Sequence, residues 1–524
     1  MKVWTRDVTA NERRYAYFIT APEMRWLWKE LGHEINRRLG MTPLLLVRSP
    51  EDRKFYEQQF NRPFEGVFAT DPDIYGLVLD DELNEAEKAA NRDRAAAFER
   101  EHGISLLRDF LLAERQYARA YMTGAKLLPR TKISHLVNSD HAINVCLTSI
   151  DHYKEVFEKY PPGLIVSVSG GSCIMGKPLS LYCKANGIPF RNMTHSRFGN
   201  RYIWAEDEYG NAPSVQESIQ KFPTPNEDEL SNVMEQVTPT GDVEFYTKML
   251  RRDIQWTRIA YQAAWQFAAY VYRTMRGYSK ARYTYRVGDV IWQMVLARWQ
   301  WKYLAHTRRP RLSELPDRKL VYFPLQSEPE VSLTGLAPFF SNQLGTIREL
   351  SMSLPADALL VVKEHPVQLC ARGQDFYESI AAMPNVALVN VQESSYRIIE
   401  KSDLVVAVTS SAAHEAAVLG RKVAYLCPHG VLHAVPHVYQ MRTFEDFVKI
   451  PRILAEDSEG DHQNRLIEGA RYFLALRELS LDLADMNQFD RDKVPTEDEI
   501  ACIAQSLVDS LDPIDETNLR QASL

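Results

Sequence analysis

The second half of the sequence alternates short apolar runs with helical segments. Apolar runs occupy 319–325, 358–362, 386–391, 404–408 and 422–427, and helical segments cover 342–353 and the stretches that end near Lys401 and Leu419. This alternation indicates βαβ units, because parallel neighbouring strands need a crossover that a helix supplies. It predicts a doubly wound α/β domain over 318–487.

The first 245 residues show a second, less regular α/β pattern. Strands are expected at 15–20, 43–47 and 163–169, and helices at 84–120 and 173–187. Residues 208–245 are rich in Pro, Asn, Glu and Asp, and we expect a loop or linker there. A chain of 524 residues is too long to fold around a single hydrophobic core. The expected fold is therefore α/β with two Rossmann-like domains, 1–245 and 318–487.

The segment 246–317 has a different character and connects the two domains. Its first sixty residues lack proline and predict two or three helices, with breaks near Gly277 and Gly288. Residues 248–311 hold fourteen Lys and Arg against two acids, a balance of +12, so with a total of −7 the remainder of the chain carries −19. Five Trp and eight other aromatic residues accompany these cations.

Such a basic, aromatic composition suits the surface of an anionic inner membrane. The alternatives are an anionic glycan acceptor, or aromatic side chains that simply pack into the N-terminal domain. No nucleic-acid-binding module is recognisable, so nucleic acid is not an expected partner.

Composition places the chain among cytoplasmic proteins. The six cysteines include no CxxC pair, which favours reduced thiols over a disulfide framework or zinc site. No apolar run approaches the roughly 18–20 residues that span a bilayer, and the first residues do not form a signal peptide. The last segment, 488–524, is expected to be an acidic tail with one helix.

Polar residues follow three of the predicted C-terminal strands. Gln326 and Glu330 follow the first strand, Lys363 and His365 end the second, and Thr409, Ser410, Ser411 and then Glu415 follow the fourth. Because ligands of open α/β sheets bind at the carboxyl ends of the strands, these residues predict a nucleotide site.

Each of these residues also has a structural interpretation. Hydroxyls at a helix start can bind phosphate with the free N–H groups, but Ser410 and Ser411 could equally cap the helix. Pro366 should hold His365 extended, where it could donate to a phosphate oxygen or simply meet a backbone carbonyl. Lys363 and Glu415 could be solvated, and Glu330 could belong to a capped turn.

The N-terminal half offers weaker candidates for the acceptor or the cleft. Gly171 and Ser172 lie in a glycine turn after a predicted strand, which could approach a ligand or be a plain turn. Arg197 could meet an anionic substrate or be structural. Asp140, beside His141, is the candidate general base, since it could take a proton from an acceptor hydroxyl.

Three motifs together carry a resemblance to a known family: Gln326-x-Glu-Pro-Glu, Lys363-x-His-Pro, and Thr409-Ser-Ser-x-x-x-Glu followed by Leu419-Gly-Arg-Lys-Val. They resemble the capsule polysaccharide biosynthesis family, GT-B-like bacterial glycosyltransferases related to Kdo transferases. The His-Pro and Ser-Ser pairs are also similar to those of bacterial GT-B sialyltransferases. The resemblance covers about 150 residues and implies that His365, Ser410 and Ser411 bind the donor phosphate, with Gln326 and Glu415 near the nucleoside.

The same resemblance implies a GT-B glycosyltransferase that moves Kdo or sialic acid from a CMP-sugar onto a capsule or lipopolysaccharide-type glycan, free or lipid-linked. It implies no cofactor and no metal. CDP-glycerol or CDP-ribitol polymer synthesis and UDP- or GDP-sugar transfer remain alternatives. A non-catalytic polysaccharide-binding or export-assembly protein is a further one, because the acidic base motif of the sialyltransferases has no counterpart here: Asp80-Asp81-Glu82 lacks the following glycine.

Overall fold

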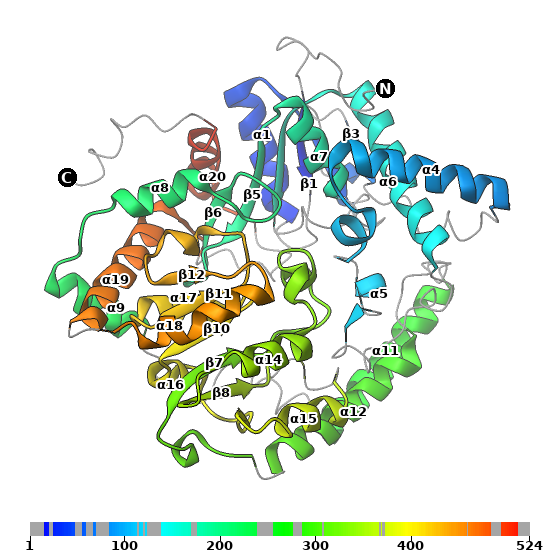
Figure 1. The fold of residues 1–524 in the computed structure, drawn as a ribbon. Coiled ribbons are helices and arrows are strands. Elements are labelled where there is room, and N and C mark those ends of the chain that lie inside the picture. The colour runs from blue at the N-terminus through cyan, green and yellow to red at the C-terminus, as the bar shows by residue number, and fades with distance from the viewer. Residues whose placement is uncertain are drawn as a thin grey trace.

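The computed structural model describes residues 15–19, 25–47, 55–58, 66–69, 83–112, 115–118, 121–122, 138–168, 176–237, 255–275, 286–306, 309–365, 368, 372–457, 460–483 and 494–511. These residues form two α/β units, one at the top and one at the lower left of Figure 1. Helices α11 (Trp256–Met275) and α12 (Val287–His306) lie at the right and below them. The expected α/β fold, with two Rossmann-like units and a helical insertion, is confirmed.

The N-terminal unit is built on a seven-stranded sheet of order β13-β6-β5-β4-β1-β2-β3. Its strands are β1 (Tyr15–Ile19), β2 (Thr42–Val47), β3 (Gly66–Ala69), β4 (Pro162–Val168), β5 (Phe190–His195), β6 (Arg201–Ala205) and β13 (Leu481–Asp482). Strands β1 to β5 pair in parallel, whereas β6 is antiparallel to both of its neighbours, β5 and β13.

Alternate side chains of these strands enter two separate cores, one on each face of the sheet. Phe18 and Leu45 pack with helices α1 (Arg25–Leu39) and α20 (Glu497–Asp509) on one face. Tyr17 and Leu44 pack with α4 (Glu85–His102), α6 (Ser139–Lys159) and α7 (Lys177–Asn186) on the other. The period of two along a strand thus decides which helices each residue meets.

The end of the chain returns to the N-terminal unit. Strand β13 pairs with β6, and Ile500, Ile503 and Leu507 of α20 are buried against α1. The helix expected in the tail is present, but it completes the N-terminal core instead of standing apart. In Figure 1, α20 lies beside α1 although the sequence separates them by more than 450 residues.

The C-terminal unit has a six-stranded sheet of order β12-β11-β10-β7-β8-β9, in which every pairing is parallel. Its strands are β7 (Lys319–Pro324), β8 (Ala358–Lys363), β9 (Val386–Leu388), β10 (Leu404–Ala407), β11 (Lys422–Tyr425) and β12 (Val438–Gln440). The main helices around it are α14 (Gln343–Met352), α15 (Gln374–Ala381), α16 (Ser395–Lys401), α17 (Ser411–Val418), α18 (Ile450–Ala455) and α19 (Asp461–Leu479).

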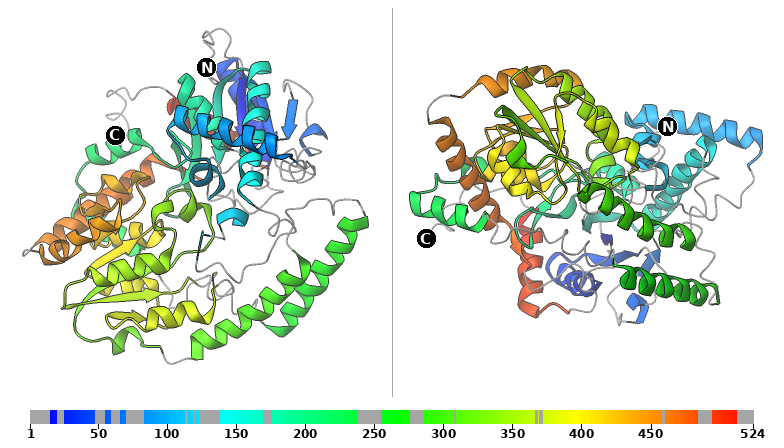
Figure 2. Two further views of the ribbon diagram at one scale, coloured as in Figure 1. Left: turned by 45° about the vertical axis from the view of Figure 1, so that its right-hand side comes forward. Right: turned by 90° about the horizontal axis from the view of Figure 1, so that it is seen from below.

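The expected loop over 208–245 is wrong for most of its described part. Residues Pro213–Lys221 form α8 and Glu227–Val237 form α9. Both helices pack against α19, and Ile219 and Val233 join the core of the C-terminal unit. The polar composition misled the prediction, because only a few apolar residues on one face of each helix make the tertiary contact. The two views of Figure 2 show α8 and α9 on the outside of that unit.

No described helix is long and apolar enough to cross a membrane.

Candidate functional site

Three neighbouring parallel strands bring the sequence motifs to one edge of the C-terminal sheet. Strand β7 lies between β10 and β8, so the residues that follow these strands emerge side by side. Gln326 follows β7, Lys363 ends β8 with His365 two residues beyond, and Thr409 follows β10. The predicted convergence of the three motifs is confirmed, while their roles in binding stay predictions.

The clearest contact within this edge joins Gln326 to the start of α17. The amide orientation that satisfies every neighbour directs its oxygen to the backbone N–H groups of Thr409 and Ser410, at 2.6 and 2.9 Å, and its nitrogen to the Thr409 hydroxyl at 2.6 Å. Ser410 caps α17, since its side chain accepts from the Ala412 N–H at 3.2 Å. Ser411, the first helical residue, is exposed. Gln326 and Thr409 are themselves buried, so they brace this edge from beneath.

Arg372 is the centre of a buried polar network below the same edge. Its guanidinium is fully buried and contacts the carboxylates of Glu364 and Glu328, the latter at 3.3 Å, and it also donates to the Gln326 carbonyl. Burial opposes its charge, but the two carboxylates outweigh burial and raise the pKa of Arg372. Gln343 of α14 completes the network by accepting from the Gln326 N–H at 2.7 Å. These bonds fix the backbone at the end of β7.

His365 lies half-buried at the end of β8, close to Glu330. Burial lowers the pKa of His365, and the Glu364 and Glu330 carboxylates oppose this shift. The imidazole is therefore neutral near pH 7 and can donate a hydrogen bond through one ring nitrogen. Lys363 does not reach solvent: it is buried, and its ammonium donates to the Ser395 hydroxyl at 2.8 Å.

The turn between β5 and β6 carries Arg197 from the N-terminal unit to the C-terminal unit. Arg197 is exposed and is the one described residue other than glycine with a positive φ, 77°, a conformation that costs free energy. Its N–H donates to Nδ1 of His195 at 2.8 Å, which holds the turn. Phe198 anchors the turn by packing edge-on against Phe473 of α19, with 4.9 Å between ring centroids.

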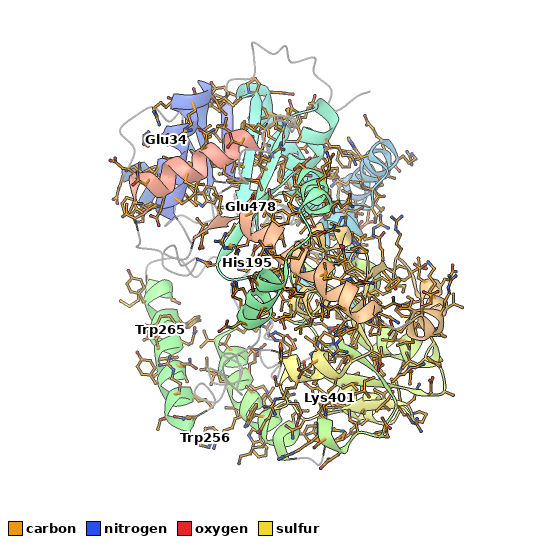
Figure 3. All side chains as sticks on the ribbon, turned by 90° about the vertical axis from the view of Figure 1, so that its left-hand side faces the viewer. Glu34, His195, Trp256, Trp265, Lys401 and Glu478 are labelled. Carbon is orange, nitrogen blue, oxygen red and sulfur yellow. The ribbon has the colours of Figure 1, made fainter. Side chains whose placement is uncertain are left out.

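The guanidinium of Arg197 consequently lies within electrostatic range of the carboxyl end of β11. Burial is the main cause of the lowered pKa of His414 in α17, and the charge of Arg197 lowers this pKa further. At the end of β11, burial raises the pKa values of Tyr425 and Cys427, and the charge of Arg197 opposes this rise. The structure thus places Arg197 near the carboxyl end of β11, while its expected contact with a substrate stays a prediction. His195 lies next to Arg197, and Figure 3 labels His195 between the two units.

The remaining sequence candidates are less informative. Asp140 lies in the first turn of α6, and its carboxylate pairs with Arg92 of α4 at 2.7 Å. Glu415 is half-buried in the second turn of α17. Gly171 and Ser172 lie outside the described residues. Among the described residues, no three His, Cys, Asp or Glu side chains are grouped as metal ligands, and metal independence stays a prediction.

Sequence reasoning missed three residues of this region: Arg372, Gln343 and His195. Arg372 and Gln343 carry no signal in the sequence, because each meets the Gln326 backbone only after the chain has folded. His195 could have been found from its spacing to Arg197, since a side chain two residues before a turn position often caps it.

The family comparison covers the carboxyl edge of the C-terminal sheet with Gln326, His365 and Thr409, which we call the polar edge. Residues 229–428 match the model of the family described as capsule polysaccharide biosynthesis protein. The resemblance carried by the three motifs is confirmed over this stretch. The matched segment spans α9, α11, α12 and the polar edge from Gln326 to Glu415, but neither Arg197 nor Asp140. Among curated proteins, none matches the chain.

Solved structures of several sugar-nucleotide proteins are similar at low identity. The β-Kdo 2,7 transferase of Thermosulfurimonas dismutans KpsC is 13% identical, and the match covers 62% of this chain and 80% of that one with a TM-score of 0.30. The β-Kdo 2,4 transferase of the same KpsC is 11% identical over 59% and 79%, with a TM-score of 0.28. The UDP-GlcNAc 2-epimerase of Neisseria meningitidis is 12% identical over 95% and 99%, with a TM-score of 0.25. At these values the three structures say nothing of this chain's substrate.

Proposed function

We propose that the chain is a glycosyltransferase of capsule polysaccharide synthesis, with its donor nucleotide bound at the carboxyl edge of β7, β8 and β10. The observation that carries this proposal is the convergence at that edge: Gln326 and Thr409 are in contact, and His365 follows the neighbouring strand β8. The match of residues 229–428 to capsule polysaccharide biosynthesis proteins supports the class of product. The acceptor, a glycan or lipid-linked glycan of capsule or lipopolysaccharide type, approaches over the N-terminal unit on the cytoplasmic side of the membrane.

The proposed donor is a CMP-linked Kdo or sialic acid, a choice that rests on the His365 and Ser410 motifs. The acceptor hydroxyl oxygen forms a bond to the anomeric carbon, the bond from that carbon to the phosphate oxygen breaks, and CMP leaves. His365 donates to the phosphate as its charge grows, and Arg197 adds positive charge from across the cleft. The proton of the acceptor hydroxyl passes to a base, and Asp140 is the candidate for this role. The carboxylate of Asp140 forms an ion pair with Arg92. No resident metal or cofactor is invoked.

A calorimetric titration of the full-length protein with CMP, CDP, UDP and GDP tests the proposal. We expect selective binding of CMP, weakened about ten- to a hundredfold in His365→Gln, since a hydrogen bond to a charged group contributes about 1.5–3 kcal/mol. The His462→Gln variant is a matched control. His462 donates from Nδ1 to the Gly420 carbonyl, which precedes β11 and so lies at the opposite edge of the sheet.

The pH dependence gives a second readout of the same residue. Since burial holds His365 neutral, a bound phosphate should draw a proton onto it. CMP should therefore bind more tightly as the pH falls toward about 6, and His365→Gln should lose this dependence. A preference for UDP or GDP would keep the transferase and discard the proposed sugar class. Failure to bind any of the four nucleotides would refute the donor site.

A further inference from the structure

Helices α11 and α12 concentrate the exposed apolar side chains of the molecule. Among the described residues, sixteen large apolar side chains are exposed, and ten of them lie on these two helices, with exposed fractions from 40% to 83%. They include Trp256, Trp265 and Phe267 of α11 and Trp292 and Trp299 of α12. The alternative that these aromatic side chains pack into the N-terminal unit is therefore wrong. Figure 3 shows α11 at the margin of the molecule, with Trp256 and Trp265 labelled on it.

The two helices are nevertheless firmly attached to the C-terminal unit. The last turns of α12 pack there: Leu304 is buried in its core, and the side chain of Gln300 donates to the Arg372 carbonyl. Helix α11 packs chiefly on α12, and Arg298 of α12 stacks over the Trp256 ring at 4.9 Å. The two helices are thus joined to the C-terminal unit close to the backbone of Arg372, which lies under the polar edge.

The charge of the two helices restricts what can cover them. Helix α11 carries Arg258 and Arg273 and no acid, and α12 carries Arg298 and Lys302 against the single acid Asp289. A second copy of the chain would bring these cations face to face, which is unfavourable. An anionic surface would be attracted instead, and Trp, Tyr and Arg are the residues enriched where protein meets lipid headgroups.

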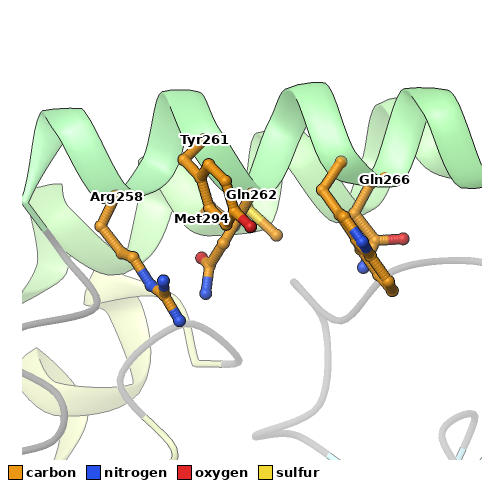
Figure 4. Close-up of a pocket in the computed structure, with 6 residues that line it drawn as sticks. Arg258, Tyr261, Gln262, Gln266 and Met294 are labelled. Atoms are coloured by element: carbon orange, nitrogen blue, oxygen red, sulfur yellow. The ribbon is translucent and has the colours of Figure 1, made fainter.

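A shallow hollow between the helices adds a feature at the scale of a headgroup. It has a volume of about 290 Å³ and is lined by Arg258, Tyr261, Gln262, Trp265, Gln266 and Met294. Figure 4 shows Arg258, Gln262 and Gln266 projecting from the same side of α11. The guanidinium and the two amides can donate hydrogen bonds to a phosphodiester. The aromatic rings beside them form an apolar surface for the adjoining glycerol and acyl carbons.

We propose that α11 and α12 dock on the surface of an anionic phospholipid bilayer, with their aromatic rings in the headgroup region. Docking holds the C-terminal unit, and with it the polar edge, at the membrane. The proposal is independent of the transferase activity, because it rests on exposure, charge and attachment alone.

Flotation of the full-length protein with lipid vesicles tests the docking. We expect binding to vesicles that contain phosphatidylglycerol, weaker binding to pure phosphatidylcholine, and a decline with added salt. The double variant Trp265→Ala/Trp292→Ala should partition at least about tenfold less, since burial of one large apolar side chain corresponds to about that factor or more. Val448→Ala and Met352→Ala remove exposed apolar side chains elsewhere and should have no effect.

A charge series separates the electrostatic part. Arg258→Gln/Lys302→Gln should weaken binding to anionic vesicles only, whereas Lys401→Gln, an exposed lysine of α16, should not. Thermal unfolding of the same variants, with the Tm of the unmodified protein as the reference, checks that the fold is intact. Absence of binding to anionic vesicles, or binding that the Trp265→Ala/Trp292→Ala variant leaves unchanged, would overturn the proposal. So would a dimer in light scattering that this variant dissociates, which would assign the surface to a second copy of the chain.

Discussion

Arg372 should be among the most costly single residues to replace in the C-terminal unit. Its side chain has no exposure and pairs with Glu364 and Glu328, whose side chains are each 1% exposed. In Arg372→Met the apolar volume is kept while two buried carboxylates lose their cation. Breaking a buried ion pair from one side costs about 3–5 kcal/mol, because a charge is left without compensation.

The expected loss is about 4 kcal/mol, which corresponds to a drop of about 12 °C in the Tm of a domain of this size. Thermal unfolding followed by calorimetry measures it, and hydrogen exchange in peptides of β7 and β8 assigns the transition to the C-terminal unit. The loss should shrink as the pH falls toward about 5, because the uncompensated carboxylates then take up protons in the folded protein.

Two variants show whether the cause is the buried charge. Arg372→Met/Glu364→Gln should regain a large part of the lost stability, since Gln keeps the shape and removes one charge. Arg452→Met is the matched control: its pair with Glu456 is on the surface, with the arginine 84% exposed, and should cost less than about 1 kcal/mol. If Arg372→Met cost no more than this control, or if Glu364→Gln failed to rescue it, the reasoning would be refuted.

Two further predictions concern the same unit. Burial lowers the pKa of His414 to about 3 and of His437 to about 4, while the unfolded imidazoles titrate near 6.5. Acid therefore favours the unfolded chain, and each histidine should lower the free energy of unfolding by up to about 1.4 kcal/mol per pH unit below 6.5. Denaturation measured at several pH values should show this slope, and replacing both histidines by Gln should reduce it. Gly469→Ala should destabilise the protein by about 3 kcal/mol or more, because a Cβ there would lie 2.3 Å from the Ala417 carbonyl oxygen of the adjacent α17. Gly288→Ala, where a Cβ meets nothing within 4 Å, should instead be neutral or slightly stabilising, and urea titration compares the two.

The local pattern of the sequence determined most elements between β7 and β11 of the C-terminal unit, and their order along the chain. Apolar runs such as 404–408 between helical segments are sufficient to predict a parallel sheet, because the crossover requirement and the period of two are local rules. Since parallel strands share a carboxyl edge, the same pattern also predicted that Gln326, His365 and Thr409 would converge.

Tertiary structure alone decided what each polar group does at that edge. The N–H groups of Thr409 and Ser410 meet the Gln326 amide, and Lys363 is withdrawn beneath the surface, because residues far apart in sequence offered partners there. It also joined α20 to the N-terminal core, turned 213–237 into two helices and carried Arg197 across to β11. These contacts depend on which surfaces meet in the folded chain, and the local spacing of residues does not predict that. The sequence does show the fourteen cations and five Trp residues of 248–311. Only the tertiary structure, however, shows that four of these Trp side chains are exposed.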